Sequence, residues 1–185
     1  MVNVNDLKNG MTILFDNNIY SVLENQHVKP GKGPAFVRTK LRNLRTGSII
    51  DHTFNAGIKL AKAHIDRNKM QFLYESGTEY FFMNLETYDQ LSLQNDQIGD
   101  DTKYLKEGLE VEMNFYEGEL LGITVPEKIE MTVTSTEPGV KGNTTSSAMK
   151  DATLETGMVI KVPLFINEGE VIIISTKDGK YSGRK

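Results

Sequence analysis

The sequence predicts an all-β protein made of three small β-barrels in a row. Short segments that alternate apolar and polar residues are separated by closely spaced Gly, Asn and Asp turns, a pattern typical of strands joined by hairpins. The charge also divides the 185 residues into three parts, and a pair of short motifs recurs in the second half of the chain, which indicates a duplicated barrel. We therefore expect little helix beyond one or two turns.

The three parts differ in charge, although the whole chain has a net charge of −4. Residues 1–64 contain nine Lys and Arg against four Asp and Glu, and residues 65–127 contain four against fourteen. Residues 128–185 contain eight against seven. We interpret these parts as three modules. The basic first module suits a polyanionic partner, whereas the acidic second module avoids one or faces a basic protein.

Composition excludes several kinds of site. The chain has no Cys, which excludes disulfides and thiolate-bound metals. Its three His residues are scattered, which argues against a zinc centre or a histidine-based catalytic group. No apolar run approaches the roughly 20 residues that span a bilayer, and the polar residues 1–6 do not look like a signal peptide. We expect a cytoplasmic protein without metal, cofactor or membrane partner.

The first module is expected to close as a barrel of five or six strands. Strand-like segments lie at residues 11–15, 19–24, 35–42 and 48–54. The first two flank an Asp-Asn-Asn turn and pair as a hairpin. Residues 59–64 are expected to connect this barrel to the next module.

A second hairpin carries a basic tip, Lys29-Pro30-Gly31-Lys32-Gly33-Pro34. Proline at each shoulder fixes φ near −65° and removes a backbone donor, so neither shoulder continues a sheet ladder. The glycines permit unusual backbone angles, which leaves Lys32 at the apex with little beside it. An ordinary surface turn explains the tip equally well. A Walker nucleotide loop does not, because its Gly-Lys must precede Ser or Thr at a helix start.

The return strand of this hairpin carries a row of cations. Arg38, Lys40 and Arg42 share one parity and therefore one face of the sheet. Arg45 follows in the next turn, where a Thr-Gly pair marks a reversal. Such a row on a rigid strand suits a phosphate backbone. A merely solvated strand face is the alternative, and the basic tip on the same hairpin counts against it.

In the acidic module, residues 70–75 and 78–83 flank a Ser-Gly hairpin turn. Residues 86–91 are expected to be a polar turn, and residues 100–105 one helical turn with an acidic cap. The aromatic residues here are Phe72, Tyr74, Tyr80, Phe81 and Phe82. They either stack on nucleic-acid bases or form the core. We favour the core, because the surrounding charge repels nucleic acid.

Two motifs recur in the second half of the chain. Leu-Lys-Glu-Gly at residues 105–108 returns as Leu-Glu-Thr-Gly at 154–157, and Gly-Glu-Leu-Leu at 118–121 returns as Gly-Glu-Val-Ile at 169–172. This repeat indicates duplicated barrels of the OB type, with a boundary at residues 126–128. Units this small bury only about 60% of their surface, so we expect the second barrel to pack on its neighbours.

Several segments resemble bacterial translation elongation factor P over the whole length of the chain. They are the tip residues 29–33, residues 35–38, 136–142, 152–157 and 162–166, and the C-terminal Tyr-Ser-Gly-Arg at 181–184. The resemblance implies an SH3-like barrel of the KOW type followed by two OB barrels, L-shaped like a transfer RNA. It also implies a non-enzymatic factor that binds the ribosome between the peptidyl and exit sites and assists peptide-bond formation at consecutive prolines.

The resemblance assigns roles to particular residues. Lys29, Pro30, Gly31, Lys32, Gly33 and Pro34 contact RNA, with Lys32 reaching toward the peptidyl-transferase centre. Arg38, Lys40 and Arg42 lie on the hairpin that faces the peptidyl transfer RNA, and Arg45 is also expected to bind RNA. Gly142, Asn143 and Thr144 occupy the family's loop near the exit-site codon, where Asn143 replaces the usual acidic residue. Tyr181 and Arg184 match its C-terminal pattern near the small subunit.

The partners implied are both ribosomal subunits and the peptidyl transfer RNA, bound by a monomer. Many family members modify the tip lysine, which would add a lysine-modifying enzyme acting on Lys32. Here proline flanks the lysine loop on both sides, and we expect a bare Lys32 in a loop that Pro34 stiffens.

Three other interpretations stay open. One is a paralogue with the same fold and a different stalling signal. Another is a general single-stranded nucleic-acid-binding OB protein, which the acidic middle module argues against. The third is an enzyme with a phosphate-binding Gly-Lys-Gly turn, which the lack of a catalytic constellation argues against.

Overall fold

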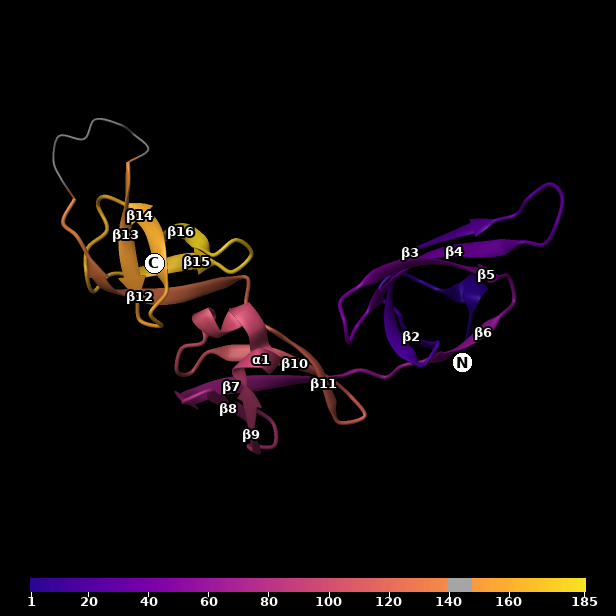
Figure 1. The fold of residues 1–185 in the computed structure, drawn as a ribbon, viewed down its shortest axis with the longest axis horizontal. Coiled ribbons are helices and arrows are strands. Elements are labelled where there is room, and N and C mark those ends of the chain that lie inside the picture. Colours follow the sequence, from indigo (N-terminus) through magenta and orange to yellow (C-terminus); the bar gives the residue numbers. More distant parts are fainter. Residues whose placement is uncertain (140–147) are drawn as a thin grey trace. The chain divides into compact units, whose positions relative to one another are not determined.

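The computed structural model of the chain describes residues 1–139 and 148–185 (Figure 1). Among the described residues, strands hold 57% and helices 7%, which confirms the all-β prediction. The strands form three sheets. The chain divides into two compact units: a first unit of residues 1–67 with 113–122, and a second unit of residues 68–112 with 123–185.

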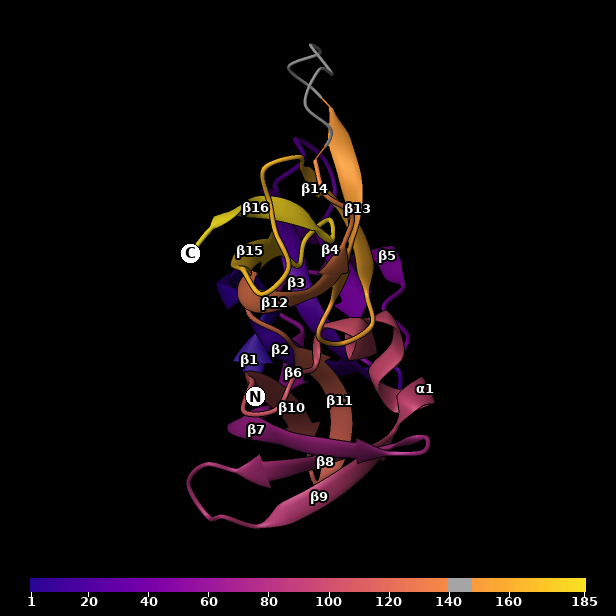
Figure 2. The ribbon, with the colours of Figure 1, turned by 90° about the vertical axis from the view of Figure 1, so that its left-hand side faces the viewer.

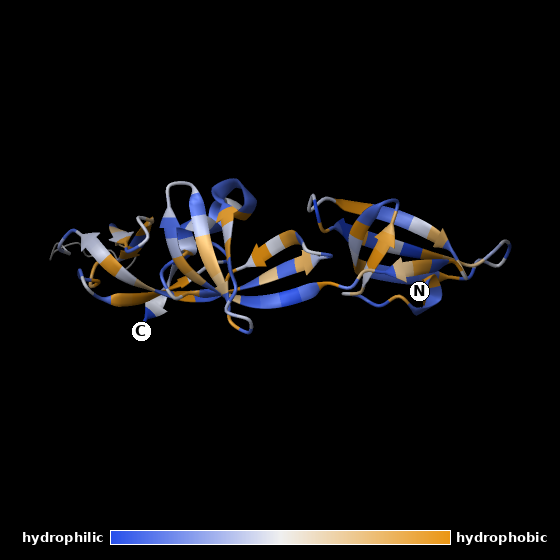
Figure 3. Ribbon diagram, turned by 90° about the horizontal axis from the view of Figure 1, so that it is seen from below, coloured by the Kyte–Doolittle hydropathy of each residue, from blue (hydrophilic) through white to orange (hydrophobic). Residues whose placement is uncertain are grey.

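The first sheet has six strands in the order β1-β6-β2-β3-β4-β5. Their bounds are β1 (Val2–Asn3), β2 (Thr12–Phe15), β3 (Asn18–Val28), β4 (Phe36–Asn43), β5 (Ile49–Asn55) and β6 (Lys59–Lys62). A 3-10 turn, η1 (Val4–Asp6), follows β1. Figure 1 shows these strands curving around a common centre as a barrel. Apolar and polar residues alternate along them (Figure 3), and the apolar set fills the interior.

The first hairpin forms as predicted. Ile13 of β2 lies opposite Tyr20 of β3, and both are buried. Asp16 and Asn17 make the turn with φ of 51° and 58°. Two successive positive φ angles match the right-handed twist of a two-residue hairpin, and Asp and Asn adopt them more readily than most residues.

The prediction that residues 59–64 are a connection is wrong. Lys59–Lys62 is strand β6, which pairs with β1 on one side and β2 on the other. Leu60 is its buried residue. Four residues are too few for a clear alternation, and the partners of β6 come from the far end of the module, so the local pattern gives no signal.

The second and third sheets each have five strands. The second sheet contains β7 (Asp66–Ser76), β8 (Glu79–Asn84), β9 (Gln90–Gln94), β10 (Glu110–Tyr116) and β11 (Glu119–Thr124). Figure 2 shows β7, β8 and β9 side by side, as their pairing requires. The third sheet contains β12 (Lys128–Thr136), β13 (Met149–Leu154), β14 (Val159–Pro163), β15 (Val171–Ser175) and β16 (Lys180–Arg184).

Between β9 and β10 lie a short helix, α1 (Asn95–Ile98), and a 3-10 helix, η2 (Gly99–Tyr104). The predicted helical turn is confirmed as η2, and Asp100 and Asp101 lie in its first turn. The predicted acidic cap is wrong, because Ile98 is the N-cap residue and no side chain caps this helix by a hydrogen bond. The helix α1 has no counterpart in the prediction. The polar turn expected at residues 86–91 ends early, because β9 begins at Gln90 and pairs with β8.

The two five-stranded sheets have the same strand order. Counted within each sheet, the order is 3-2-1-4-5 in both, which supports the duplicated architecture. The sequence repeat is nevertheless misaligned with it. Residues 105–108 precede the fourth strand of their sheet, β10, whereas residues 154–157 join the second and third strands of theirs. Gly108 and Gly157 have φ of 84° and 87°, so the motifs share turn chemistry rather than position.

Within the second unit, Tyr104 of η2 is buried among the apolar residues of the third sheet and is 2% exposed. Its hydroxyl donates to the carbonyl oxygen of Thr176 at 3.4 Å. A Cβ at Gly179 would lie 3.1 Å from that hydroxyl, so glycine leaves the space that the tyrosine occupies. The hydroxyl of Thr156 also donates to the carbonyl oxygen of Lys103 at 2.7 Å. The expected packing of the second barrel is confirmed for one neighbour, the third sheet, within the second unit.

Candidate nucleic-acid interface

The basic tip joins β3 to β4 and is exposed at Lys32. Nothing lies within 4 Å of a Cβ built at Gly31 or Gly33, and Gly33 has φ of 97°. A non-glycine residue would be strained at that angle. Among the described residues, neither Lys29 nor Lys32 enters an ion pair. The tip therefore presents an ammonium group with no internal partner.

The hairpin beneath the tip is regularly paired up to its last residues, where Val28 lies opposite Phe36. The next residues on each side leave the ladder, and Pro30 and Pro34 stand in this unpaired segment. Proline has no backbone N–H to donate, so the ladder ends there without losing a hydrogen bond. The tip is therefore anchored at both ends by the paired strands β3 and β4.

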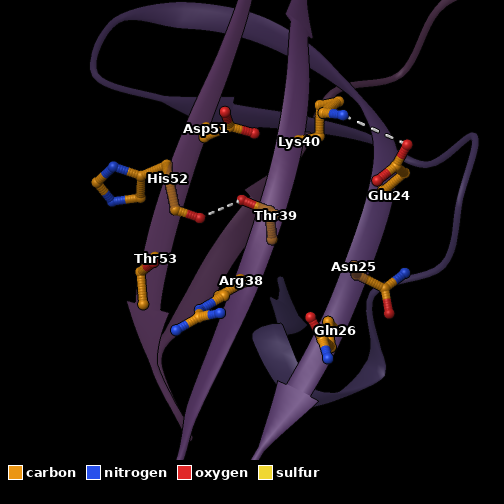
Figure 4. A pocket seen from close by; sticks show the side chains of 9 residues that line it. All are labelled: Glu24, Asn25, Gln26, Arg38, Thr39, Lys40, Asp51, His52 and Thr53. Atoms are coloured by element: carbon orange, nitrogen blue, oxygen red, sulfur yellow. Dashed lines mark hydrogen bonds and ion pairs between the residues drawn. The ribbon is translucent and has the colours of Figure 1, made fainter.

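The face of β4 that carries the cations is as predicted. Val37, Thr39 and Leu41 are buried on the inner face, while Arg38 and Arg42 are exposed on the outer face. The hydroxyl of Thr39 donates to the carbonyl oxygen of His52 on β5 at 2.7 Å, which satisfies the polar group on the buried side (Figure 4).

Residues of β3, β4 and β5 line a hollow of about 430 Å³. It is lined by Glu24, Asn25, Gln26, Arg38, Thr39, Lys40, Asp51, His52 and Thr53 (Figure 4). Lys40 lies directly opposite Glu24 on one side and Asp51 on the other. Its Nζ is 3.5 Å from Glu24 Oε1. The row of cations is therefore interrupted at its middle member.

The other two cations have no acidic residue opposite them. Arg38 lies between Gln26 and Thr53, and Arg42 between Ser21 and Ile49. The guanidinium of Arg38 stands 5.4 Å from the ring centre of Phe36, a cation–π distance that orients it without neutralising it. These two arginines retain their charge for an external anion.

Arg45 is held inside the first unit. Its Nε and one terminal nitrogen donate to the two carboxylate oxygens of Glu119 at 3.1 Å each, and its other terminal nitrogen donates to the carbonyl oxygen of Asn17 at 3.2 Å. The hydrogen bonds to Glu119 raise the pKa of Arg45. A bidentate pair of this kind restrains the side chain and reduces its availability to RNA.

The C-terminal candidates have internal partners as well. Tyr181 packs partly buried against the core of the third sheet. Arg184 donates to Glu170 at 3.0 Å, and its guanidinium lies 5.3 Å from the ring centre of Phe165. Gly142, Asn143 and Thr144 lie outside the described residues.

The aromatic residues of the second sheet divide between two environments. Phe72 and Phe82 are 4% and 0% exposed, which confirms the core prediction for them. For Tyr74 that prediction is wrong, because it is 52% exposed and stacks on Phe81 with ring centres 4.6 Å apart. The register shifts between Phe72 and Tyr74. This bulge reverses the parity of the strand and turns Tyr74 outward.

Glu24 and Asp51 belong to the site, and sequence reasoning does not single them out. Each is the single acidic residue of its strand, and only the pairing of β3 and β5 with β4 places them beside Lys40. In the described ranges, no cluster of His, Asp and Glu suits a metal ion. Nor does any helix there have the length and apolarity to cross a membrane.

Comparisons with known proteins place the chain among translation factors. Three family descriptions match in order: "Elongation factor P (EF-P) KOW-like domain" over residues 3–60, "Elongation factor P (EF-P) OB domain" over residues 65–123, and "Elongation factor P, C-terminal" over residues 129–184. Proteins named elongation factor P from Phytoplasma australiense and Onion yellows phytoplasma (strain OY-M) are each 60% identical over 185 residues, covering 100% of this chain and 98% of each relative.

Two solved structures are similar in fold. Eukaryotic translation initiation factor 5A from Methanococcus jannaschii is 30% identical with a TM-score of 0.56, over 67% of this chain and 91% of that chain. A translation initiation factor eif-5a family protein from Naegleria fowleri ATCC 30863 has a TM-score of 0.54 over 67% of this chain and 96% of that chain. At 17% identity, this second likeness concerns the fold alone.

Proposed function

Because the chain belongs to the elongation factor P family, we propose that it binds the ribosome between the peptidyl and exit sites and relieves stalling at consecutive prolines. As a member of that family it is a translation factor. The observation that carries the finer proposal is the tip: an exposed lysine at the apex of a paired hairpin, with no ion-pair partner in the part of the chain that the structure describes.

The proposed mechanism is positional. Proline reacts poorly in peptide-bond formation mainly through its restricted geometry, so holding the end of the peptidyl transfer RNA reduces an entropic barrier. Well-oriented reactants can gain several kcal/mol in this way. Lys32 contacts the transfer RNA near the reacting end, and Arg38 and Arg42 bind its backbone lower on the hairpin. The factor supplies no nucleophile or general base and leaves the chemistry to the ribosome.

The remaining assignments complete the proposal. The modules are residues 1–64, 65–127 and 128–185. The protein acts in the cytoplasm as a monomer that contacts both ribosomal subunits. Gly142, Asn143 and Thr144 are assigned to contact near the exit-site codon, and Tyr181 and Arg184 to contact near the small subunit.

Reconstituted translation tests the proposal directly. Two messages are compared, one with three consecutive proline codons and one in which alanine codons replace them. Adding the protein accelerates synthesis from the proline message and leaves the alanine message unchanged. Ribosome binding without any acceleration at prolines would instead favour a paralogue with a different stalling signal.

The state of Lys32 is tested separately by intact mass spectrometry of the protein from its native host. We propose a bare lysine, because a loop restrained by proline on both sides loses less entropy when it binds. An added mass that maps to Lys32 would contradict this and would identify a lysine-modifying enzyme as a partner.

A further inference from the structure

We propose that Glu24 and Asp51 set the RNA selectivity of the first module. Their carboxylates repel any RNA that places a phosphate at Lys40. This inference rests on the proposed function, because it concerns the face that would meet the peptidyl transfer RNA.

The geometry places one cation between two anions. Glu24, Lys40 and Asp51 lie opposite one another on β3, β4 and β5 (Figure 4). Directly opposed residues of antiparallel strands have Cβ atoms about 5 Å apart. A phosphate that approaches Lys40 therefore meets a carboxylate on each side, well within the screening length of about 8 Å at physiological salt.

The neighbouring positions are different. Arg38 and Arg42 face only uncharged residues across the sheet. They are four positions apart along β4, which is about 13 Å at roughly 3.3 Å per residue. An RNA whose phosphates meet both arginines and leave the middle free gains both contacts. An RNA that lies along the whole row is repelled at its centre, and repulsion of wrong partners is a common source of specificity.

Stability does not explain the two acids. The side chains of Lys40 and Glu24 are 41% and 69% exposed, and their nearest atoms are 3.5 Å apart. Exposed pairs of this kind contribute little to folding. Asp51 makes no ion pair with any residue that the structure describes. Two carboxylates on a face intended for RNA therefore point to a role in binding.

The test uses the full chain with both acids neutralised, Glu24→Gln and Asp51→Asn. Equilibrium binding to labelled poly(U) and to purified ribosomes is measured over a range of salt concentrations. We expect poly(U) to bind roughly three- to tenfold more tightly at low salt, from the removal of two close like charges. Ribosome binding should change less than twofold, so the preference for ribosomes falls.

A matched control keeps the net charge the same as in the variant. Asp6→Asn with Asp16→Asn removes two exposed negative charges from the first unit, and neither residue lines the hollow. Asn is also suited to the positive φ at position 16. This control should bind poly(U) as the unmodified protein does, and melting temperatures should confirm that both variants fold.

Two outcomes overturn the inference: unchanged poly(U) binding in the Glu24→Gln, Asp51→Asn variant, or an equal gain in the control. Failure of the proposed function looks different. It appears in the unmodified protein, as ribosome binding no tighter than poly(U) binding, and the two variants still decide the role of Glu24 and Asp51 from their poly(U) affinities alone.

Discussion

At the scale of single residues, Lys32 stands between two glycines, and nothing lies within 4 Å of a Cβ built at either of them. Its side chain contributes almost nothing to packing, so a substitution there should change activity without changing the free energy of unfolding. Tyr80 shows the opposite case, a polar group drawn partly into the second sheet. The two positions lead to different measurements.

We expect Lys32→Ala to abolish the acceleration of proline-rich messages in reconstituted translation. The free energy of unfolding should stay within about 0.5 kcal/mol of the original value, as for most surface substitutions. Lys8→Ala, which removes an exposed lysine from the same module, is the control and should keep full activity. If Lys32→Ala translated the proline message at the normal rate, the tip would be an ordinary turn.

Tyr80 should titrate later than a free tyrosine. Burial and, second, the neighbouring Glu75 carboxylate raise the pKa of its phenol above 10.0. The folded state thus favours the neutral phenol, and the stability that this provides is complete below the unfolded pKa and is lost as the pH rises through the folded pKa. Absorbance titration of tyrosinate should show a late component that Tyr80→Phe removes. Identical curves for the two proteins would contradict the assignment.

At the scale of elements, β4 has an inner face that packs in the core and an outer face that carries cations. Its cations differ in how strongly they can attract an external anion, because the residues opposite them on β3 and β5 differ in charge. Lys40 is opposed by two acids, whereas Arg38 and Arg42 are not. The strand is therefore not a uniform cationic row, and its members should contribute unequally to RNA binding.

Replacing Arg38, Lys40 and Arg42 with Ala should weaken ribosome binding and flatten its salt dependence by about one unit of slope or more, because fewer counterions are released. Arg38→Ala with Arg42→Ala should account for most of this change, and Lys40→Ala alone for little of it. Binding measured from low to physiological salt provides the slopes. An unchanged slope in the triple variant would mean that this face is merely solvated.

At the scale of the whole molecule, the small sheets depend on one another for burial. In the second unit, Tyr104 extends from η2 into the core of the third sheet. Barrels of about 60 residues bury too little surface to be very stable alone. A shared side chain of this size lets the two sheets support each other.

Tyr104→Ala should lower the free energy of unfolding by about 3 kcal/mol, as for other large aromatic residues removed from a core. Tyr104→Phe should lower it by no more than about 1 kcal/mol, because it loses only the hydroxyl's hydrogen bond. Urea denaturation measures both values. Equal small losses for the two variants would show that the ring is not buried as described.

Much of the fold follows from local patterns. The Asp-Asn turn, the parity of β4 and the glycine-flanked lysine each depend on residues close together in the chain, so their geometry is readable from order and spacing. Most of the predictions that are wrong concern features that depend on residues far apart in the chain. β6 has partners that are distant in sequence, the recurring Gly motifs mark turns rather than equivalent strands, and a bulge reverses the parity at Tyr74.

The sequence by itself determined the all-β class, the basic hairpin with Lys32 at its apex, and the resemblance that identifies the family. Those features depend on composition, turn chemistry and period-two alternation, which act over a few residues. Only the tertiary structure decided that Glu24 and Asp51 flank Lys40 and that Tyr104 enters another sheet. Strand register and inter-sheet packing are set by contacts between residues far apart in the chain, and no local pattern records them.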